Sequence, residues 1–300
     1  MQDFDLTLSI CSWNTLEDLR ACLQSLEKVR DEARFEVIVA DNASIDGSAE
    51  MVQKEFPWVR LIRLCYNIGF AGGHNLNFHY SKGKLFMPLN SDTIVHPHAI
   101  RNIVEFMKEN PPVGVLGPKL LNPDGSLQFS CRRFPTPQAA LFRNTILGKL
   151  FPKNRYTREY LMQDWAHDEA KDVDWVSGAA ICVRREVFER LGGFDERFFM
   201  YLEDVDLCYR THQSNYRVVY LPTAVITHAI GRSTDKAANR MIRQFHRSML
   251  LFYKKHYMKN VPFVFRPFVL LAAWDFLFLR QNSLILRNVF HAVVRGLKRA

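Results

Sequence analysis

The stretch Leu6-Thr-Leu-Ser-Ile-Cys-Ser12 predicts a buried strand near the start of the chain. The residues that follow, 16–29, carry apolar side chains at helical spacing, and Phe35-Glu-Val-Ile-Val-Ala40 predicts a second buried strand. A strand, a helix and a second strand in this order form a βαβ unit, whose right-handed crossover makes the two strands parallel. This unit indicates an α/β fold.

The same alternation continues to residue 89. We expect helices at 48–56 and 73–80, and strands at 59–64 and 84–89. The sequence therefore predicts a Rossmann-like, mostly parallel sheet flanked by helices. Sheets of this kind bind their ligands beyond the carboxyl ends of the strands.

Polar side chains gather at these predicted strand ends. They are Ser12-Trp13-Asn14, Asp41-Asn42, Asn67 and Asn90-Ser91-Asp92. The oxygen atoms of the last group suit a hard cation that also holds phosphates, Mg²⁺ or Mn²⁺, but the same residues suit a helix cap equally well. Asp41 could accept a hydrogen bond from a nucleobase or ribose, or could cap the turn that follows it.

The glycine-rich segment Tyr66-Asn-Ile-Gly-Phe-Ala-Gly-Gly-His-Asn75 follows one predicted strand and opens a predicted helix. Small residues permit close backbone approach, and a helix N-terminus offers free N–H groups to a phosphate. The segment does not match the GxGxxG fingerprint of dinucleotide-binding proteins. A glycine-rich turn without a ligand explains it equally well.

The second half of the chain has a less regular pattern. We expect helices at 98–108 and 203–212, and strands at 113–117, 173–183 and 217–221. Residues 132–172 are rich in aromatic and charged residues without clear periodicity, so we expect a long, partly mobile loop region there. His228 would lie just beyond the last strand and its Pro222 turn.

Three carboxylates, Glu203, Asp204 and Asp206, follow an aromatic run at 198–201. Adjacent like charges beside apolar surface are costly unless a cation, a substrate hydroxyl or a hydrogen-bond donor compensates them. The cluster is therefore a candidate general base or metal ligand. The alternative is the first turn of a helix, where the helix dipole favours acidic residues. His228 belongs to no zinc motif, and a lone histidine is usually structural.

The overall composition is that of an ordinary folded protein, with 48% hydrophobic and 24% charged residues among 300. The N-terminus carries Asp3 and Asp5 and leads directly into the first strand, so we expect no signal peptide there. The six cysteines form no CxxC pair. We therefore expect reduced thiols in a cytoplasmic protein.

The net charge of +9 is concentrated near the C-terminus. Residues 231–300 contain 14 Lys/Arg and 2 Asp/Glu, whereas the first 230 residues contain 26 and 29. From Leu284 onward, apolar residues lie on one side of a predicted helix and basic residues on the other; the apolar ones are Leu286, Val289, Phe290, Val293 and Leu297, and the polar ones are Arg287, His291, Arg295 and Lys298. Such a helix in the 261–300 region suits an anionic membrane surface, or it packs on the rest of the chain or on a second subunit of a homo-oligomer.

Several ordered motifs together resemble family 2 glycosyltransferases of the GT-A fold, most closely the bacterial rhamnosyltransferase-like group that builds cell-surface polysaccharides. The resemblance covers residues 6–228. It implies a catalytic domain at 1–230, with a nucleotide-sugar half at 1–95 and an acceptor half at 96–230, followed by a helical extension at 231–300. The motifs are Ser9-Ile-Cys-Ser-Trp-Asn14, Asp41-Asn-Ala-Ser-x-Asp-Gly47, Asn67-x-Gly-Phe-Ala-Gly-Gly-x-Asn75, Leu89-Asn-Ser-Asp92, Trp175-Val-Ser-Gly-Ala179, Gly192-Gly-Phe-Asp195 and Glu203-Asp-Val-Asp206.

The resemblance also implies roles for individual residues. Asp204 would be the catalytic base with Glu203 beside it, while Asp92 and His228 would hold Mg²⁺ or Mn²⁺. The acceptor would be bordered by Trp175, Ser177 and Gly178. The nucleotide-sugar donor would lie against Ser12, Trp13, Asn14, Asp41, Asn67, Phe70, Ala71, Gly72, Asn75, Asn90, Ser91 and Asp92. The family's DxD element begins with Asn90 here, and because an amide adds no charge we expect a modest metal affinity.

The implied reaction is the inverting transfer of a sugar to a hydroxyl of a saccharide or polyprenyl-diphosphate-linked acceptor. The resemblance favours L-rhamnose from dTDP-rhamnose, with a UDP-linked hexose as the alternative. Together with the cysteine pattern and the basic tail, it leads us to expect a cytoplasmic enzyme bound peripherally to the inner face of the plasma membrane.

Two other classes of protein fit the sequence less well. A basic nucleic-acid-binding protein would explain the pI of about 9.3 but not the acidic strand ends, and the sequence lacks the known nucleic-acid-binding motifs, so no nucleic-acid partner is expected. A sugar-nucleotide pyrophosphorylase would carry a basic, glycine-rich triphosphate loop near the first strand, where this chain has Ser12-Trp13-Asn14.

Overall fold

The computed structural model of the chain describes residues 4–143, 146–229 and 238–297, with side chains as far as Leu286 in the last range. The chain forms two compact units. The first comprises residues 1–196 and 203–233, and the second comprises residues 197–202 and 234–300. The grouping of 197–202 with the C-terminal helices has no counterpart in the sequence pattern, which places a single boundary at residue 230.

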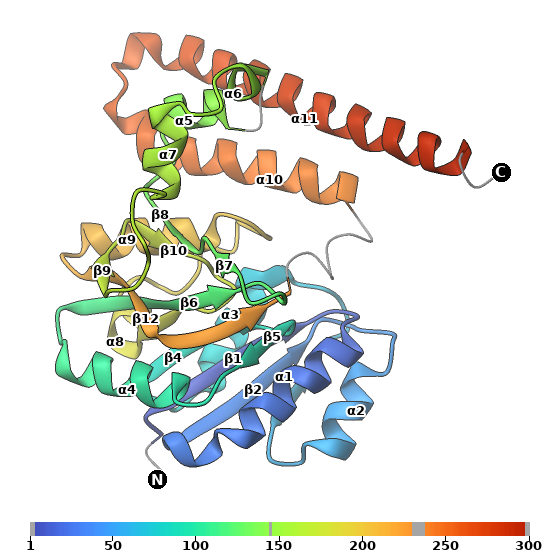
Figure 1. Cartoon of the computed structure of the whole chain (residues 1–300), viewed down its shortest axis with the longest axis vertical. Coiled ribbons are helices and arrows are strands. Elements are labelled where there is room, and N and C mark those ends of the chain that lie inside the picture. Colours follow the sequence, from blue (N-terminus) through green and yellow to red (C-terminus); the bar gives the residue numbers. More distant parts are fainter. Residues whose placement is uncertain (1–3, 144–145, 230–237, 298–300) are drawn as a thin grey trace. The chain divides into compact units, whose positions relative to one another are not determined.

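The first unit is built on a ten-stranded sheet whose first four strands are parallel (Figure 1). In sheet order they are β3 (Arg60–Arg63), β2 (Phe35–Asp41), β1 (Leu6–Ser12) and β4 (Leu85–Asn90). All four strands were predicted from the sequence, with ends that differ by one residue at most. They confirm the βαβ interpretation of the N-terminal half.

Beyond β4 the sheet is mixed. Its path continues through β11 (Cys182–Arg184), β6 (Val113–Leu121), β12 (Arg217–His228) and β5 (Thr93–Val95), while β7 (Leu127–Gln128) pairs with β6 and β9 (Lys171–Asp172) pairs with β12. Two further short strands, β8 (Cys131–Arg132) and β10 (Trp175–Val176), form a separate antiparallel pair. The α/β fold class predicted from the sequence is confirmed.

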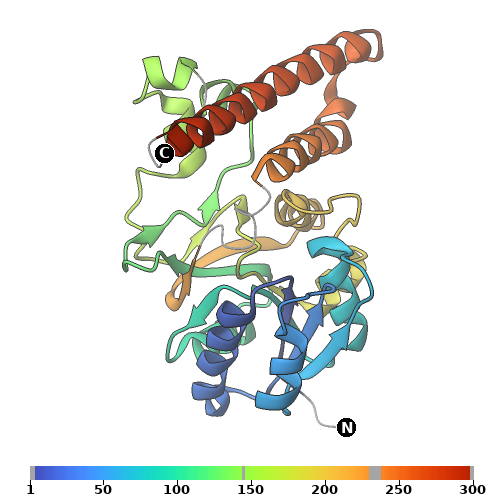
Figure 2. The ribbon, with the colours of Figure 1, turned by 90° about the vertical axis from the view of Figure 1, so that its right-hand side faces the viewer.

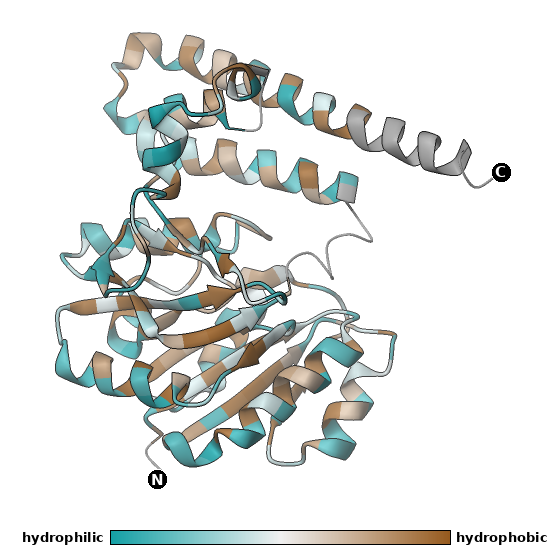
Figure 3. Cartoon of the chain, viewed as in Figure 1, coloured by the Kyte–Doolittle hydropathy of each residue, from teal (hydrophilic) through white to brown (hydrophobic). Residues whose placement is uncertain are grey.

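Alternating residues of β1 determine which helices cover the two faces of the sheet. Leu6, Leu8 and Ile10 belong to a large apolar core that also contains Leu19, Leu23 and Leu26 of α1 (Leu16–Lys28). Ser9 and Cys11 point to the opposite face, where Ser9 lies 2.7 Å from His74 of α3 (Gly69–Tyr80). Figures 1 and 2 show α1 and α3 on these opposite faces, and Figure 3 shows the hydrophobic strands between them.

Helix α3 lies unusually close to the sheet. A Cβ atom added to Gly73 would lie 2.4 Å from the sulfur of Cys11, so only glycine permits this approach. Asn77, one turn further along, is fully buried and donates hydrogen bonds to the carbonyl oxygens of Ile10 and Ile38. The helix begins at Gly69, four residues earlier than predicted, so most of the glycine-rich segment is helix.

The remaining helices of this unit are short and lie on connections between strands. They are η1 (Arg30–Glu32), α2 (Ser48–Glu55), α4 (Ala99–Glu109), α5 (Pro137–Phe142), α6 (Ile146–Leu150), α7 (Arg155–Leu161), α8 (Arg185–Arg190) and α9 (Glu203–Gln213). Helices α5, α6 and α7 occupy the segment 132–172, so the expectation of a long loop there was wrong. Their lengths of five to seven residues are too short to produce a clear helical period in the sequence.

Two strand predictions in the second half also need correction. Residues 173–183 do not form one strand, because the chain turns at Ser177 and Gly178 and its two ends join different sheets as β10 and β11. Strand β12 continues past Pro222 to His228 through a shift in register between Leu221 and Val225. His228 is therefore the last residue of a strand and is held in the sheet opposite Thr93.

The second unit contains two long helices, α10 (Ala238–Phe252) and α11 (Arg266–Leu297), joined by the short turns η3 (Tyr253–Tyr257), η4 (Met258–Asn260) and η5 (Phe263–Phe265). The segment 197–202 packs on α10, where Ser248 donates a hydrogen bond to the carbonyl of Met200 (2.9 Å) and Tyr201 meets the ring of Phe245. Within the part of the chain that is described, no helix combines the length and apolar character needed to cross a membrane. The side chains from Arg287 onward, which carry most of the predicted amphipathic pattern, lie outside the described residues.

Candidate active site

The polar ends of three neighbouring strands meet at one edge of the sheet. In the parallel register, Ser12 at the end of β1 lies opposite Asp41 of β2, and Cys11 lies opposite Asn90 of β4. The carboxyl ends of parallel strands share an edge, which is why residues far apart in sequence come together here. We call this the strand-end edge, comprising Ser12–Asn14, Asp41 and Asn90–Asp92.

Asp41 has an unused oxygen atom at this edge. The residue is 3% exposed, and its Oδ2 accepts a hydrogen bond from the backbone N–H of Ser44 (3.1 Å). Its Oδ1 has no hydrogen-bond partner among the described residues. A buried carboxylate oxygen without a partner is costly, so Asp41 is suited to accept a hydrogen bond from a ligand. Beside it, Trp13 leaves 36% of its surface exposed.

Ser12 and Ser91 are joined through a residue that the motifs do not single out. The hydroxyl of Thr15 lies 2.9 Å from that of Ser12 and 2.9 Å from that of Ser91, and all three side chains are buried. This chain of hydroxyl groups ties the end of β1 to the turn that carries Asp92. Asn14, with φ 54°, accepts a hydrogen bond from the N–H of Ile45 and so connects the ends of β1 and β2.

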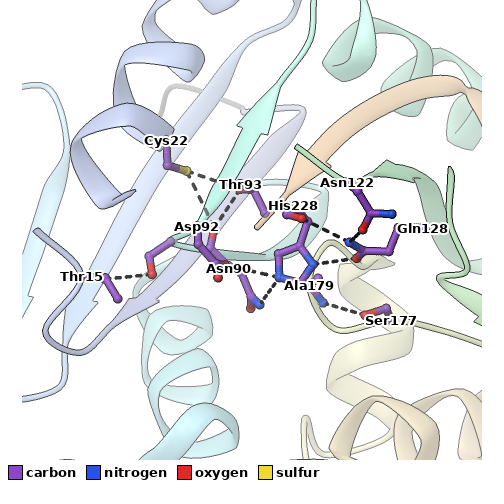
Figure 4. Close-up of polar contacts among 11 residues, drawn as sticks. Thr15, Cys22, Asn90, Asp92, Thr93, Asn122, Gln128, Ser177, Ala179 and His228 are labelled. Atoms are coloured by element: carbon purple, nitrogen blue, oxygen red, sulfur yellow. Dashed lines mark hydrogen bonds and ion pairs between the residues drawn. The ribbon is translucent and has the colours of Figure 1, made fainter. Parts of the chain in front are cut away.

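Asp92 and His228 lie side by side at the strand-end edge (Figure 4). The Nε2 atom of His228 is 3.4 Å from Oδ1 of Asp92 and 3.2 Å from the side-chain nitrogen of Asn90. On the far side of the ring, Nδ1 donates a hydrogen bond to the side-chain oxygen of Gln128 (2.8 Å). In the neutral ring, this bond selects the tautomer in which Nε2 carries the lone pair and faces Asp92.

Gln128 is itself held in place. Its amide nitrogen donates hydrogen bonds to the side-chain oxygen of Asn122 (2.9 Å) and to the carbonyl of His228 (3.2 Å). Metal-binding histidines are commonly oriented through the ring nitrogen that does not bind the metal, and Gln128 occupies that position. Within the described residues, however, no group of three His, Cys, Asp or Glu side chains could hold a metal ion. The possible ligands are one carboxylate, one imidazole and the Asn90 amide.

Asp204 stands at the start of α9, where both of its carboxylate oxygens accept backbone hydrogen bonds. Oδ2 accepts from the N–H of Gly178 (2.8 Å) and Oδ1 from the N–H of Val205 (2.8 Å). A Cβ atom on Gly178 would lie 3.3 Å from Cβ of Asp204 and 3.4 Å from the ring of Phe70. Gly178, Asp204 and Phe70 are thus in close contact although they come from three separate motifs.

The environment of Asp204 makes it a stronger base than an ordinary aspartate. Burial raises its pKa, whereas the two backbone N–H groups and the charge of Arg132 oppose that increase. Its neighbour Glu203 is 5% exposed, and one of its carboxylate oxygens has no partner among the described residues. Burial and the adjacent charge of Asp204 raise the pKa of Glu203 well above its usual range.

Asp206, the third carboxylate of the cluster, forms a buried ion pair with Arg210 one turn later (2.7 Å). Arg210 also donates hydrogen bonds to the carbonyls of Leu191 and Gly193. Asn75 holds the same loop from the other side, because its side chain bonds both the N–H and the carbonyl of Phe194 and a carboxylate oxygen of Glu196. Asp206 and Asn75 thus fix the loop 191–196.

Other members of the predicted sets have local roles in the structure. Asn67 accepts a hydrogen bond from the N–H of Gly69 (2.8 Å) at the start of α3, and Ala71 and Gly72 are buried in that helix. Trp175 is buried, donates from its indole N–H to the carbonyl of Arg133 (2.8 Å), and lies under the guanidinium of Arg132. Ser177 accepts from the N–H of Ala179 (3.3 Å).

The sequence patterns did not single out three residues that lie near the site: Thr15, Gln128 and Arg132. Gln128 lies 100 residues from its partner His228, and β7 and β8, which carry Gln128 and Arg132, are two residues long. Neither spacing nor periodicity marks such positions. Thr15 could have been noticed as a polar residue directly following Asn14.

Comparison with known proteins agrees with this architecture. The profile described as "Glycosyltransferase like family 2" matches residues 4–246. N-acetylglucosaminyl-diphospho-decaprenol L-rhamnosyltransferase from Mycobacterium tuberculosis is 32% identical over 235 residues, which cover 74% of this chain and 75% of that protein. The low-salt glycan biosynthesis hexosyltransferase Agl10 of Haloferax volcanii is 26% identical over 71% of this chain and 64% of its own length.

Solved structures with the same fold include a mannosyltransferase from Pyrobaculum calidifontis in complex with GDP-Man and Mn²⁺, with a TM-score of 0.56 and 19% identity over 94% of this chain and 72% of that one. GalNAc-T7 with UDP, GalNAc and Mn²⁺ gives a TM-score of 0.58 and 16% identity over 75% and 44% of the two chains. This chain belongs to glycosyltransferase family 2 and is a glycosyltransferase of the GT-A fold.

Proposed function

We propose that this enzyme transfers a sugar from a nucleotide-sugar donor to a hydroxyl of a lipid-linked saccharide in cell-surface polysaccharide synthesis. L-rhamnose from dTDP-rhamnose is the favoured sugar, because the relative that is 32% identical is an L-rhamnosyltransferase. A UDP-linked hexose is the alternative, in line with the similarity to a hexosyltransferase. The observation that carries the proposal is the position of Asp204, a half-buried carboxylate anchored on the Gly178 turn.

Asp204 acts as the general base. Its carboxylate takes the proton of the acceptor hydroxyl as that oxygen attacks the anomeric carbon of the donor sugar. The hydrogen bonds from Gly178 and Val205 orient the carboxylate, and its raised pKa strengthens it as a base. A single displacement of this kind inverts the anomeric configuration. Glu203 lies directly beside the base, and Trp175, Ser177 and Gly178 border the acceptor.

The strand-end edge holds the nucleotide. The free oxygen of Asp41 accepts a hydrogen bond from the base or ribose, and the exposed ring of Trp13 offers a stacking surface beside it. Ser12, Asn14 and Ser91 shape this pocket through the hydrogen bonds that join the strand ends. Asn67, Phe70, Ala71 and Gly72 form the wall toward the sugar, and Asn75 supports this wall by holding the loop 191–196.

Asp92 and His228 fit a divalent cation, Mg²⁺ or Mn²⁺. A carboxylate oxygen and a neutral imidazole nitrogen 3.4 Å apart, with the far ring nitrogen anchored by Gln128, provide two ligands in a fixed orientation. Half a rotation of the Asn90 amide would present its oxygen as a third. The bound cation would offset the negative charge that develops on the departing diphosphate.

A screen of nucleotide sugars tests the assignment. The purified protein is incubated with dTDP-rhamnose or UDP-linked hexoses, with and without Mg²⁺ or Mn²⁺, and a lipid-linked N-acetylhexosamine acceptor. Transfer from dTDP-rhamnose with inverted configuration is the expected result. Transfer from a UDP-hexose alone would overturn the choice of sugar, and failure of every donor would overturn the activity.

The second unit supports attachment to a membrane surface. Phe263, Val264 and Phe268, at η5 and the start of α11, are 81%, 71% and 70% exposed, and Lys254 and Lys259 lie on the preceding turns. Exposed aromatic residues beside basic ones suit an anionic bilayer. We infer that this surface docks peripherally on the cytoplasmic leaflet, where a polyprenyl-linked acceptor would lie.

Vesicle binding tests this docking. The double substitution F263S/F268S is expected to abolish sedimentation with phosphatidylglycerol-containing vesicles. Ile45→Ser, which removes a 92% exposed apolar side chain from the first unit, is the matched control and is expected to have no effect. The contrary result is a wild-type protein that does not sediment with vesicles and forms dimers that are lost in F263S/F268S. That result would show that the surface joins two subunits of a homo-oligomer.

A further inference from the structure

Two arginine side chains flank one buried tyrosine next to the site. The guanidinium carbon of Arg132 lies 5.9 Å from the ring centre of Tyr160, and that of Arg143 lies 5.1 Å from it. Arg143 also donates a hydrogen bond to the hydroxyl of Tyr160 (3.1 Å). Tyr160 is 7% exposed, so both cations lie against a buried ring. We call Arg132 and Arg143 the arginine pair.

The arginine pair lacks an anionic partner in the described part of the chain. Neither guanidinium forms an ion pair with a carboxylate there, and Nε of Arg132 is buried without a hydrogen-bond partner. Arg132 makes one hydrogen bond, to the carbonyl of Phe129 (3.2 Å). Burial and the charge of Arg132 lower the pKa of Arg143. Two neighbouring cations that form no ion pair are costly, and a bound anion would compensate them.

The position of the pair indicates which anion it binds. Arg132 lies on β8, where it pairs with Trp175 of β10. The turn that follows β10 contains Gly178, whose N–H holds Asp204. Arg132 also lies over the Trp175 ring (5.1 Å), and its charge acts on the pKa of Asp204. The arginine pair therefore lies on the acceptor side of Asp204. The strand-end edge, to which we assign the nucleotide, is formed by other elements.

We propose that Arg132 and Arg143, with Tyr160 between them, bind the diphosphate of a lipid-diphosphate-linked acceptor. Guanidinium groups bind phosphate oxygens through paired hydrogen bonds, and two of them match the charge of a diphosphate. In an acceptor with a single sugar on the diphosphate, the attacking hydroxyl and the diphosphate are attached to the same sugar ring. A cationic site beside the base therefore places that hydroxyl against Asp204. This inference rests on the proposed function, because it names the part of the acceptor that the enzyme recognises.

Two acceptors separate this role from a structural one. One is an N-acetylhexosamine on a short prenyl diphosphate, and the other is an uncharged alkyl glycoside of the same sugar. R132Q and R143Q are each expected to lower kcat/KM for the diphosphate acceptor by about 10-fold to 100-fold, the loss expected for a charge-assisted hydrogen bond. At a pH where Asp204 is deprotonated in both variants, kcat/KM for the alkyl glycoside and the KM of the nucleotide sugar should change less than about twofold.

R133Q is the matched control, because Arg133 is the next residue but is exposed and paired with Asp174 (3.0 Å). It should leave both acceptors unaffected. Equal losses with the two acceptors would overturn the proposal and indicate a packing role. A higher KM for the nucleotide sugar, with unchanged use of the acceptor, would assign the pair to the donor diphosphate instead and would also overturn it.

A binding measurement tests the arginine pair without requiring any enzyme turnover. Inorganic pyrophosphate, added with a chelator so that no metal-bound site competes, should raise the melting temperature of the wild type and of R133Q but not of R132Q/R143Q. Stabilisation of the double variant to the same extent would overturn the proposal. If the wild type transferred no sugar to any acceptor, the proposed function would fail, while this measurement would still decide whether the pair binds diphosphate.

Discussion

The strand-end edge and the Asp204 side of the site are assembled in different ways. The edge consists of residues that directly follow strands β1, β2 and β4, so the parallel register alone brings them together. The Asp204 side is formed by a two-residue strand pair, a glycine turn and the first turn of α9, joined by hydrogen bonds between residues such as Gly178 and Asp204 that lie 26 positions apart. The edge therefore follows from the topology, whereas the position of Asp204, the proposed base, depends on a few specific contacts. This contrast predicts that substitutions at the edge impair nucleotide and metal binding, whereas substitutions around Asp204 impair the chemical step.

The largest effect is expected at the base. Asp204→Asn retains the shape of the side chain but cannot take a proton, so kcat should fall by about 10²-fold to 10⁴-fold with the Kd of the nucleotide sugar nearly unchanged. Steady-state kinetics and calorimetry measure the two quantities. Glu203→Gln serves as the comparison, since its carboxylate lies beside the base. Wild-type turnover of D204N would remove Asp204 from its assigned role.

At the strand-end edge, Gln128→Leu removes the hydrogen bond that orients His228 while leaving Asp92 and His228 in place. Apparent Mn²⁺ affinity should fall by about 10-fold to 100-fold, as expected when the partner of a metal-binding histidine is lost. Titration of activity with Mn²⁺ measures it, and saturating metal should restore much of the rate. Asn122→Ala, one contact further away, should have a smaller effect. An unchanged metal requirement in Q128L would separate His228 from metal binding.

The pH dependence of activity tests the environment of Asp204. Burial raises the pKa of this group, and the base works only when deprotonated. Activity should therefore be complete above the raised pKa and be lost as the pH falls through it, at a higher pH than an ordinary aspartate with a pKa of 3.8 would give. In R132Q, which lacks the opposing positive charge, the loss should move to still higher pH. A profile of kcat/KM that is flat down to the ordinary aspartate pKa would contradict the assignment.

The smallest effect concerns stability and compares two adjacent glycines of α3. Gly73→Ala places a Cβ atom 2.4 Å from the sulfur of Cys11 and should lower the free energy of unfolding by about 1–3 kcal/mol. Gly72→Ala meets only Ile68 atoms at 3.4 Å and should be neutral or stabilising by up to about 1 kcal/mol. Urea denaturation measures both. Equal stabilities would show that α3 can move away from β1 without cost.

The sequence predicted the N-terminal half well because its elements are long enough for their periodicity to be visible. Strands β1, β2 and β4 are six or seven residues long, and α1 has thirteen. The region 132–172 was wrongly expected to be a loop because its helices are five to seven residues long. Residues 173–183 were wrongly expected to be one strand because the chain turns at Ser177 and Gly178, where the N–H of Gly178 bonds Asp204, a residue outside the segment.

The sequence by itself determined the α/β fold, the polar strand ends and, through its ordered motifs, the family to which the chain belongs. Each of these depends on local patterns or on residue order. Only the tertiary structure decided which motif residues are available to a ligand: Asp41 keeps a free oxygen, whereas Asn75 and Asp206 are engaged in holding the loop 191–196. It also brought Gln128 to His228 and Arg132 to Arg143 across Tyr160. Such contacts join distant residues through the geometry of the folded chain, and no local pattern encodes them.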